Sequence, residues 1–352
     1  MVNKTLLEKL KKNTTIKQTH SLEQSILFQD VEEVPTEVPA LNVALSGRLD
    51  GGITPGITIW AGESKRFKTS FSLLMGKTYL DKYEDAVILF YDSEFGSPMS
   101  FFDSFGIDTS RVIHTPITDI EELKFDLVNQ LENIERDDHV IIIIDSLGNL
   151  ASKKERDDAL DAKSVADMTR SKSFKSLFRI ITPHLKLKNI PLVGVNHTYK
   201  SMSLYPTDVV SGGTGSMYSA DNVFIVGRKQ EKKEKEIEGY HFIIKVEKSR
   251  FVKEKKNIPI TVNFDKGISK FSGLLELALL SGHVVAPKKG WYSHPDSDKK
   301  YRAADLNNKE FWQPILEDET FQQYIEDRYK LSIDSIIEDD DIDAEISSVE
   351  GE

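Results

Sequence analysis

The sequence predicts an α/β protein built on a mostly parallel sheet that helices cover on both faces. Fully apolar runs of strand length recur near residues 57–61, 86–92, 140–145 and 190–196. Stretches with apolar residues at helical spacing separate these runs, at 70–82, 120–135 and 164–187. Strands without polar alternation are buried on both faces, which is typical of parallel sheets with helical crossovers. Three later runs, at 222–228, 240–248 and 258–264, have charged turns between them and predict hairpins at the edge of the sheet.

The composition is that of an ordinary folded chain. The 352 residues are 39% hydrophobic and 29% charged, which is enough for one full-sized core and a small satellite domain. There is no cysteine, which excludes disulfides, zinc ribbons and thiol catalysis. The N-terminus lacks the apolar segment of a signal peptide, and no apolar run approaches the roughly 18 residues of a membrane span. We therefore expect a cytoplasmic protein.

The net charge of −11 is concentrated at the C-terminus. Nine acidic and no basic residues fall in Asp334–Glu352, so the rest of the chain carries a net charge of only −2. The acidity is therefore local and does not argue against a nucleic-acid partner. This tail has too few apolar residues to pack, and we expect it to be disordered.

Residues 57–69, ITIWAGESKRFKT, join an apolar strand to the end of a phosphate-binding loop. The common pattern is G-x-x-x-x-G-K-[ST], and here Phe67 replaces the second glycine. Such a loop turns backbone N–H groups toward nucleotide phosphates, while Lys68 reaches the terminal phosphates and the Thr69 hydroxyl holds Mg²⁺. The relaxed pattern is common by chance, but the strand before it and the helical spacing after it support the assignment. The residues expected around the phosphates are Gly62, Glu63, Ser64, Lys65, Arg66, Phe67, Lys68, Thr69 and Ser70.

Acidic residues follow the second and third apolar strands, which end in YDSE at 91–94 and in DS at 145–146. Because the carboxyl ends of parallel strands share one edge, Gly62, Glu94 and Asp145 should converge on one crevice. Asp145 matches an aspartate that holds Mg²⁺, and the alternative is a carboxylate that caps the next helix. Glu94 is the candidate general base that activates water, and the alternative is a solvated loop glutamate.

Eight segments occur in an order that resembles the RecA/Rad51 class of recombinases: GESKRFKT, FYDSEFG, IIIIDSLGNLASKKE, VADMTR, KSLFRI, VNHTY, GGTGSMYSAD and VEKSR. The resemblance runs from about Pro39 to Leu331 and is greatest to the T-even bacteriophage members, whose phosphate loop also carries phenylalanine. It implies a RecA-like P-loop ATPase core that uses ATP and Mg²⁺. The implied activity is that of an ATP-dependent DNA recombinase, which forms a filament on single-stranded DNA and catalyses homologous pairing and strand exchange in recombination, repair and replication.

The same resemblance adds residues to the site. Phe101 falls where the class has an aromatic residue that stacks on adenine, although the usual tyrosine is absent. His197 falls where the γ-phosphate is sensed, and the alternative is a strand-end histidine bonded to backbone. Lys248 and Arg250 match a pair that reaches the neighbouring subunit's ATP; without the resemblance they would form a solvated hairpin face. The residues implied in catalysis are Glu94, Lys68, Lys248, Arg250 and His197.

DNA is expected, by the resemblance, at two loops that face the filament axis, at about 151–166 and 199–216. Acidic residues balance the basic ones in the first loop, and the second has a flexible glycine-rich end. Proteins hold single-stranded DNA in this way through electrostatic contacts with its backbone and stacking on its bases, with little recognition of sequence. The expected DNA-binding residues are Lys153, Lys154, Arg156, Lys163, Tyr199, Lys200, Gly212, Gly213, Thr214 and Gly215.

The chain is expected to have four parts: a subunit-linking arm at 1–38, the RecA-like ATPase core with its DNA-binding loops at 39–268, a small α+β domain at 269–333, and the acidic tail at 334–352. In the arm, SILF at 25–28 is a candidate edge strand that docks on a neighbouring subunit. In the small domain, Trp291 and Trp312 are expected to anchor a core rather than to bind a ligand. The tail could mask the DNA path, keep the protein soluble, or dock a basic partner.

The expected partners are single-stranded DNA, homologous duplex DNA, further copies of the chain in a helical filament, a UvsY-like mediator and single-strand-binding proteins. Two alternative functions stay open. A hexameric DNA helicase has the same ATPase core, and a DNA-coating protein could bind ATP without hydrolysing it.

Overall fold

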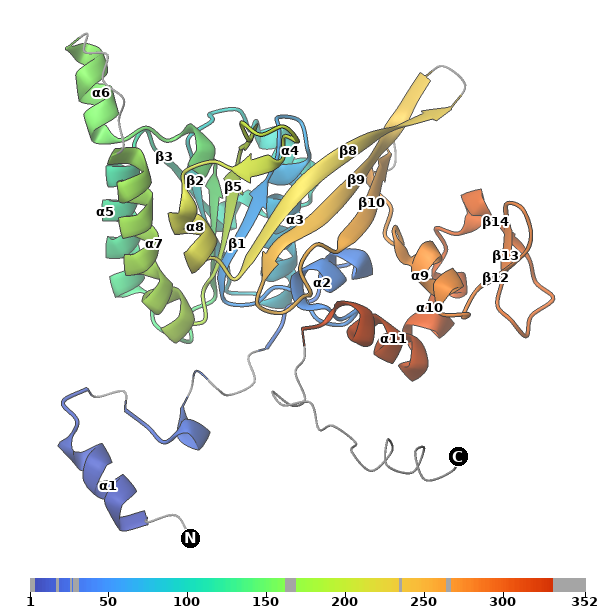
Figure 1. Cartoon of the computed structure of the whole chain (residues 1–352), viewed down its shortest axis with the longest axis horizontal. Coiled ribbons are helices and arrows are strands. Elements are labelled where there is room, and N and C mark those ends of the chain that lie inside the picture. Colours follow the sequence, from blue (N-terminus) through green and yellow to red (C-terminus); the bar gives the residue numbers. More distant parts are fainter. Residues whose placement is uncertain are drawn as a thin grey trace, which may run out of the picture.

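The structure is a computed structural model that describes residues 4–16, 19–25, 27, 32–161, 169–233, 236–263 and 267–331. Its centre is a nine-stranded sheet of order β11-β10-β9-β8-β1-β5-β4-β2-β3 (Figure 1). The strands are β1 (Gly56–Ala61), β2 (Val87–Asp92), β3 (Val112–Pro116), β4 (Val140–Asp145), β5 (Pro191–Asn196), β8 (Asn222–Lys233), β9 (Glu236–Ser249), β10 (Asn257–Asn263) and β11 (Gly267–Ile268).

Six strands of this sheet run parallel, and three are added antiparallel at one edge. Strands β3, β2, β4, β5, β1 and β8 pair in parallel register. Strands β9, β10 and β11 continue from β8 as antiparallel neighbours. The predicted parallel sheet with hairpins at its edge is confirmed. Strand β3 was not expected, because its sequence VIHTP is short and largely exposed.

Helices cover both faces of the sheet, as the fully apolar strands predict. In β4, Ile141 and Ile143 belong to one buried cluster and Ile142 and Ile144 to the other, since successive side chains of a strand point to opposite faces. The helices are α1 (Lys4–Asn13), α2 (Pro39–Ser46), α3 (Lys68–Lys82), α4 (Met99–Ser104), α5 (Ile120–Asn133), α6 (Lys153–Leu160), α7 (Thr169–Leu187), α8 (Thr214–Ser219), α9 (Leu274–Leu280), α10 (Lys309–Leu316) and α11 (Glu319–Tyr329).

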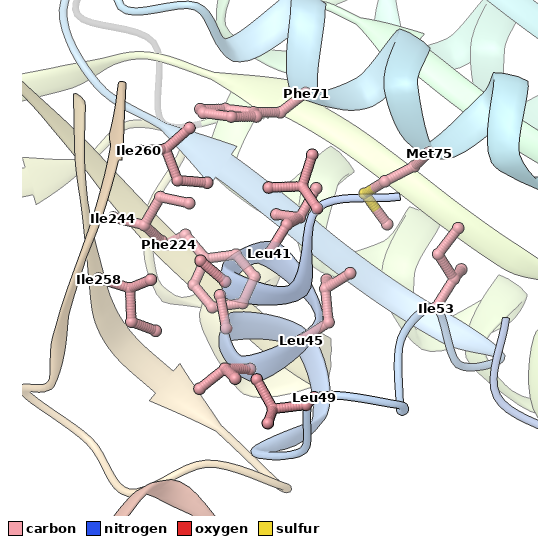
Figure 2. Packing of buried hydrophobic residues seen from close by; sticks show 14 of the residues in the cluster. Leu41, Leu45, Leu49, Ile53, Phe71, Met75, Phe224, Ile244, Ile258 and Ile260 are labelled. Carbon is pink, nitrogen blue, oxygen red and sulfur yellow. The ribbon is translucent and has the colours of Figure 1, made fainter. Parts of the chain in front are cut away.

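One face of the sheet packs against α2 and α3. Leu41 and Leu45 of α2 point toward Ile244, Ile258 and Ile260 of β9 and β10, and Phe71 of α3 lies beside them (Figure 2). Helix α2 begins with a proline in its first turn, where the missing N–H does no harm, and ends at Gly47 with φ 80°. This cluster fixes the antiparallel edge of the sheet against the helix that carries the phosphate loop.

The C-terminal part forms a small unit around α9–α11 and a three-stranded antiparallel sheet. Its strands are β12 (Val285–Lys288), β13 (Trp291–Ser293) and β14 (Tyr301–Arg302). Trp312 is buried in this part, which confirms its expected role as a core anchor. Trp291 differs from the expectation, because it is only partly buried and the guanidinium of Arg302 lies 5.1 Å from its ring.

The two segments expected as DNA-binding loops contain regular structure. The first holds α6, which begins with a capping box between Ser152 and Glu155, so most of the described part of this expected loop is helical. The second holds a hairpin of β6 (Thr198–Lys200) and β7 (Asp208–Val210), followed by α8. Lys163 and the acidic tail lie outside the described residues.

The N-terminal arm is described only in part. Ser25 and Leu27 of SILF are not in a strand, and its other two residues lie outside the described ranges. Helix α1 stands apart from the sheet and exposes Leu6, Leu7 and Leu10 by 51%, 41% and 59% (Figure 1). None of the described helices has the length and apolar character needed to cross a bilayer.

Candidate nucleotide-binding site

The expected site residues meet at the carboxyl ends of the parallel strands. The strand register places Ala61 beside Asn196 and Asp92 beside Asp145, so the loops after β1, β2, β4 and β5 open on the same edge. A cavity of about 800 Å³ lies there. The predicted residues that line it are Ser64, Lys65, Arg66, Phe67, Lys68, Thr69, Ser70, Glu94, Phe101, Asp145 and His197.

The phosphate loop is curled tightly between β1 and α3. Lys65 and Phe67 have left-handed backbone conformations, with φ 59° and 63°. Gly62 has φ 154°, and a Cβ there would lie 2.9 Å from the carbonyl oxygen of Val226. Glycine is therefore required where the loop leaves the strand. The loop's backbone and the start of α3 present N–H groups on the cavity side, which suits an anion.

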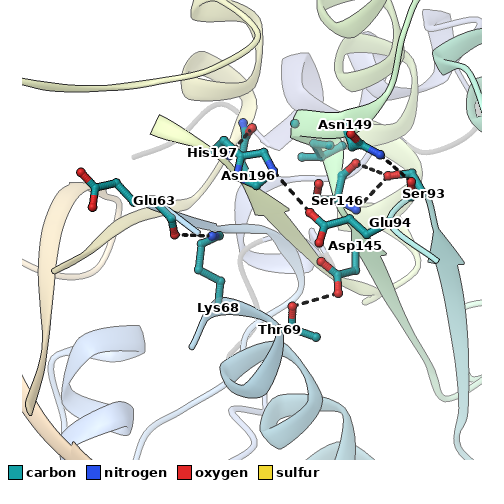
Figure 3. A network of polar contacts seen from close by, with 12 residues as sticks. Glu63, Lys68, Thr69, Ser93, Glu94, Asp145, Ser146, Asn149, Asn196 and His197 are labelled. Atoms are coloured by element: carbon teal, nitrogen blue, oxygen red, sulfur yellow. Dashed lines mark hydrogen bonds and ion pairs between the residues drawn. The ribbon is translucent and has the colours of Figure 1, made fainter. Parts of the chain in front are cut away.

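Lys68 is the first residue of α3, directly after the loop. Its ammonium donates a hydrogen bond to the carbonyl oxygen of Glu63 at 2.8 Å, and its side chain is only 6% exposed (Figure 3). Burial lowers the pKa of Lys68, while the nearby carboxylates of Glu94 and Asp145 oppose this shift. Among the described residues, this ammonium has one hydrogen bond, to a carbonyl, and two carboxylates nearby. A bound phosphate would stabilise its positive charge further.

Asp145 is a buried carboxylate that accepts a hydrogen bond from one side chain among the described residues. The Thr69 hydroxyl donates to its Oδ2 at 2.9 Å, whereas its Oδ1 is buried without a hydrogen-bond partner (Figure 3). Burial raises the pKa of Asp145 to about 6. The Thr69 hydroxyl and the orphaned oxygen fit a Mg²⁺ ion. Among the described residues, no three His, Cys, Asp or Glu side chains are grouped so that they could hold a metal ion. Mg²⁺ usually takes few protein ligands and completes its shell with phosphates and water.

Glu94 is held toward the cavity by its own loop. Nε2 of His197 lies 3.3 Å from its Oε1, and this contact with His197 lowers the pKa of Glu94 although partial burial opposes the shift (Figure 3). The buried Asp92 accepts the N–H groups of Glu94 and Phe95 at 3.0 and 2.7 Å, which fixes the turn after β2. Glu94 is therefore ionised at neutral pH, as a general base must be.

A hydrogen-bond network that the sequence did not reveal joins the turn after β2, which carries Glu94, to the turn after β4. The Ser93 hydroxyl donates to the carbonyl of Ser146 at 2.7 Å and accepts its N–H at 3.0 Å, and the Asn149 amide donates to the carbonyl of Ser93 at 2.6 Å. A Cβ on Gly148 would lie 2.3 Å from Cδ2 of His197. In the sequence, the run of small and polar residues after β4 was the one feature that could have indicated this network.

Phe101 lines the cavity from α4, with its ring edge-on to Phe105 at 5.5 Å. Three further residues, which sequence reasoning missed, line the same cavity from β8 and β9. They are Arg228, Tyr240 and Phe242. In the sequence, Phe242 could not be told from the alternating core residues of its strand.

Lys248 and Arg250 lie away from the cavity, toward the opposite end of β1. The ammonium of Lys248 donates to three carbonyls at the end of α8, those of Met217, Tyr218 and Ala220, at 2.7, 3.1 and 2.8 Å. Nε of Arg250 lies 3.2 Å from Oδ1 of Asp221. Within one chain, neither cation can reach the nucleotide cavity of that chain.

Several expected DNA-binding cations have acidic partners in the chain. Arg156 lies 2.8 Å from Asp119, Lys200 lies 2.8 Å from Asp208, and Lys154 pairs with Asp158. In the second segment, Tyr199 is 57% exposed, and Gly212 and Gly213 have φ 89° and 78°. Thr214 and Gly215 begin α8, and Lys153 begins α6. The geometry alone does not reveal a basic surface here.

The sheet and its phosphate loop are those of a RecA-like P-loop domain. The family described as "RecA N-terminal domain" matches residues 3–269, and the family described as "Bacteriophage T4, Recombination and repair protein, C-terminal domain" matches residues 271–325. The chain belongs to the RecA family of recombinases.

Individual relatives agree with this assignment. The chain is 48% identical over 341 residues to the "Recombination and repair protein" of Enterobacteria phage T4, covering 94% of this chain and 87% of the relative. It is 23% identical over 275 residues to "Protein RecA" of Syntrophus aciditrophicus, covering 76% of each chain. It is 25% identical over 274 residues to "Protein RecA" of a Synechococcus strain, covering 75% of this chain and 68% of the relative.

Proposed function

We propose that this protein is a DNA-dependent ATPase that forms a helical filament on single-stranded DNA, pairs it with a homologous duplex and exchanges strands. One observation carries the proposal: in a chain of the RecA family, Lys68, Thr69, Glu94 and Asp145 converge on one cavity. The phage origin of the 48% identical relative supports the cytoplasm of an infected cell as the proposed location.

In the proposed reaction, water attacks the terminal phosphate of ATP. Glu94 accepts the proton of that water, and His197 keeps the carboxylate oriented. Lys68 and the N–H groups of the loop bind the phosphate oxygens on which charge accumulates. Thr69 and Asp145 would hold Mg²⁺, which neutralises phosphate charge when bound. Phe101 is placed to cover the adenine, and closure of the pocket over it would exclude water.

The site is completed by a second copy of the chain. Lys248 and Arg250 lie outside their own cavity, so any contact they make with ATP is with that of a neighbouring subunit. The arm at 1–38 would link subunits, and the exposed leucines of α1 need such a partner to become buried. In this proposal, residues 39–268 form the ATPase core, 269–333 the small domain and 334–352 a tail that modulates DNA binding.

DNA would lie along α6 and the β6–β7 hairpin. Binding requires the basic residues there to exchange their intrachain carboxylates for DNA phosphates, so affinity should fall steeply with salt. The exposed Tyr199 offers a ring for base stacking. A mediator and single-strand-binding proteins are the proposed accessory partners.

A multiple-turnover phosphate-release assay, run with and without single-stranded DNA, tests the proposal. We expect DNA to stimulate release, and Lys68→Ala to lower it by about two orders of magnitude or more, because the charge opposite the terminal phosphates is lost. Absence of turnover would instead support the DNA-coating protein. Electron microscopy with a non-hydrolysable ATP analogue decides the other alternative: helical filaments support the recombinase, and closed rings with unwinding of a forked duplex support a helicase.

A further inference from the structure

Phe67 occupies a backbone position that the common phosphate-loop pattern gives to glycine. Its φ and ψ are 63° and 17°, in the left-handed region. An ordinary L-residue pays about 1–2 kcal/mol for this conformation, whereas glycine does not. The loop therefore carries strain immediately before Lys68, and some other interaction of Phe67 must offset it.

The ring of Phe67 supplies that interaction. It stacks on Phe242 of β9, with centroids 5.1 Å apart and planes at 25°, and meets Phe71 of α3 edge-on at 5.3 Å and 79°. Phe71 in turn packs against Trp60 of β1 at 5.0 Å. Aromatic pairs contribute about 0.5–1.5 kcal/mol each beyond burial, so two pairs are enough to offset the strain.

A second set of contacts connects the same loop to β8 and β9. Nη1 of Arg228, in β8, donates to the carbonyl oxygen of Lys65 at 3.1 Å. The guanidinium of Arg228 lies 4.3 Å from the ring centroid of Tyr240 in β9. The loop is thus fastened to the β8–β9 hairpin by an aromatic stack on one side and a backbone hydrogen bond on the other.

We propose that Phe67 is a positioning residue that holds the phosphate loop in its nucleotide-binding shape before ATP arrives, with Phe242 as its partner. The proposal rests on the ATPase function proposed above. Phe67 acts through the backbone next to Lys68, not on the reacting atoms. Its loss should therefore weaken nucleotide binding, since part of the binding energy would be used to order the loop, and should affect the chemical step less.

Substitutions at Phe67 distinguish the contribution of the aromatic ring from the contribution of the backbone conformation. Phe67→Gly restores the common pattern and relieves the strain, but it removes the stack and makes the loop backbone more flexible, so we expect it to raise the KM for ATP several-fold, with kcat within about threefold of the parent. Phe67→Ala removes the stack and keeps the strain, so its KM should be higher still. Phe67→Tyr keeps both and should retain a KM close to that of the parent.

The test measures KM and kcat in the presence of single-stranded DNA, together with the Kd of a fluorescent non-hydrolysable ATP analogue. Phe242→Leu should raise both KM and Kd, and the loss of binding in the double variant Phe67→Gly/Phe242→Leu should be smaller than the sum of the two single losses, because the two variants remove the same stacking interaction. Phe271→Ala is the matched control: it removes a partly buried ring stacked on Trp312 at 6.0 Å, in the C-terminal part, and should lower the melting temperature without changing Kd.

Two results would overturn the inference: a Phe67→Gly protein that binds the analogue as tightly as the parent, or additive losses in the double variant. Lys68→Ala tests the proposed ATPase function independently of the positioning role of Phe67. If Lys68→Ala abolishes turnover while Phe67→Gly binds normally, only the positioning role of Phe67 is rejected. If Lys68→Ala leaves turnover intact, the ATPase site itself is rejected.

Discussion

Two buried aspartates at opposite ends of the parallel strands differ in how well the chain satisfies them. Asp145, at the carboxyl end of β4, is 3% exposed and has one hydroxyl donor and an orphaned oxygen. Asp221, level with the start of β1, is 2% exposed. Its Oδ2 accepts the N–H of Ile57 at 2.9 Å, and its Oδ1, which also lacks a hydrogen bond, has the cations of Lys186 and Arg250 at 2.8 and 3.2 Å. The chain therefore places two cations beside Asp221 and no ion-pair partner among the described residues beside Asp145.

Under the proposed function, this difference distinguishes a structural carboxylate from a functional one of the same type. Burying a carboxylate without compensation destabilises the folded protein, so an incompletely paired one persists only where a ligand completes it. Burial and residue type alone do not distinguish the two. The cations around each carboxylate do: two lie within 3.2 Å of Asp221, and none of the described cations forms an ion pair with Asp145.

Replacing Asp145 should have the largest effect on activity. We expect Asp145→Asn to lower DNA-stimulated hydrolysis by about 100-fold or more, because the charge that would hold Mg²⁺ is lost. Its folded state should be as stable as the parent or more so, since a neutral amide does not carry the burial penalty of the carboxylate. Phosphate release and urea denaturation measure the two effects, and an unchanged rate would place Asp145 with the structural carboxylates.

Glu94→Gln tests the neighbouring carboxylate. Turnover should fall about 100-fold while the Kd of a non-hydrolysable ATP analogue stays near that of the parent, because only the proton acceptor is lost. Loss of nucleotide binding in this variant would show that Glu94 shapes the cavity instead of acting as the base.

Lys248→Ala and Arg250→Ala test whether the opposite end of the strands serves another subunit. Each should strongly reduce hydrolysis without weakening ATP binding by the dilute protein, because its target lies on a neighbour. Mixing either variant with Lys68→Ala should restore part of the activity, since some mixed interfaces contain one intact site. No recovery at any ratio would argue that these cations only cap α8 and pair with Asp221.

The raised pKa of Asp145 predicts a pH dependence of stability. Its folded pKa of about 6 exceeds the unfolded value, so between about pH 4 and 6 the folded state binds more protons than the unfolded state. Stability should therefore fall as pH rises through this window, by up to about 3 kcal/mol relative to Asp145→Asn. Denaturation of both proteins in EDTA, from pH 4 to 7, measures this difference; parallel curves would contradict it.

Asp221→Asn should have a smaller effect of opposite sign to that of Asp145→Asn. We expect it to lower the free energy of unfolding by about 1–2 kcal/mol, because two cations lose their charge partner but remain partly in contact with water. The same urea series tests this. Equal changes in the two asparagine variants would remove the distinction between the carboxylates.

Much of the fold and of the cavity could be predicted because the signals are local. The apolar runs of β1, β2, β4 and β5 set the parallel sheet, and chain order then placed the loop at Gly62, Glu94 and Asp145 on one edge. Strand β3 was missed because an exposed edge strand lacks an apolar run.

The remaining features depend on residues that meet only after folding. Phe67 and Phe242 lie far apart in the sequence, and no sequence pattern indicates that their rings stack. The three carbonyls around Lys248 belong to the end of a helix whose position no local pattern encodes. Contacts of this kind follow from the packing of whole elements and cannot be read from spacing.

Strand β9 carries both Phe242, beside its own phosphate loop, and Lys248, six residues further on. An extended strand spans about 20 Å over six residues and resists stretching along its length. In the proposed filament, each such strand would touch two successive nucleotides, its own through Phe67 and the neighbour's through Lys248. Occupancy of one site would then bias the next, and ATP saturation curves of the DNA-bound protein should have a Hill coefficient above one.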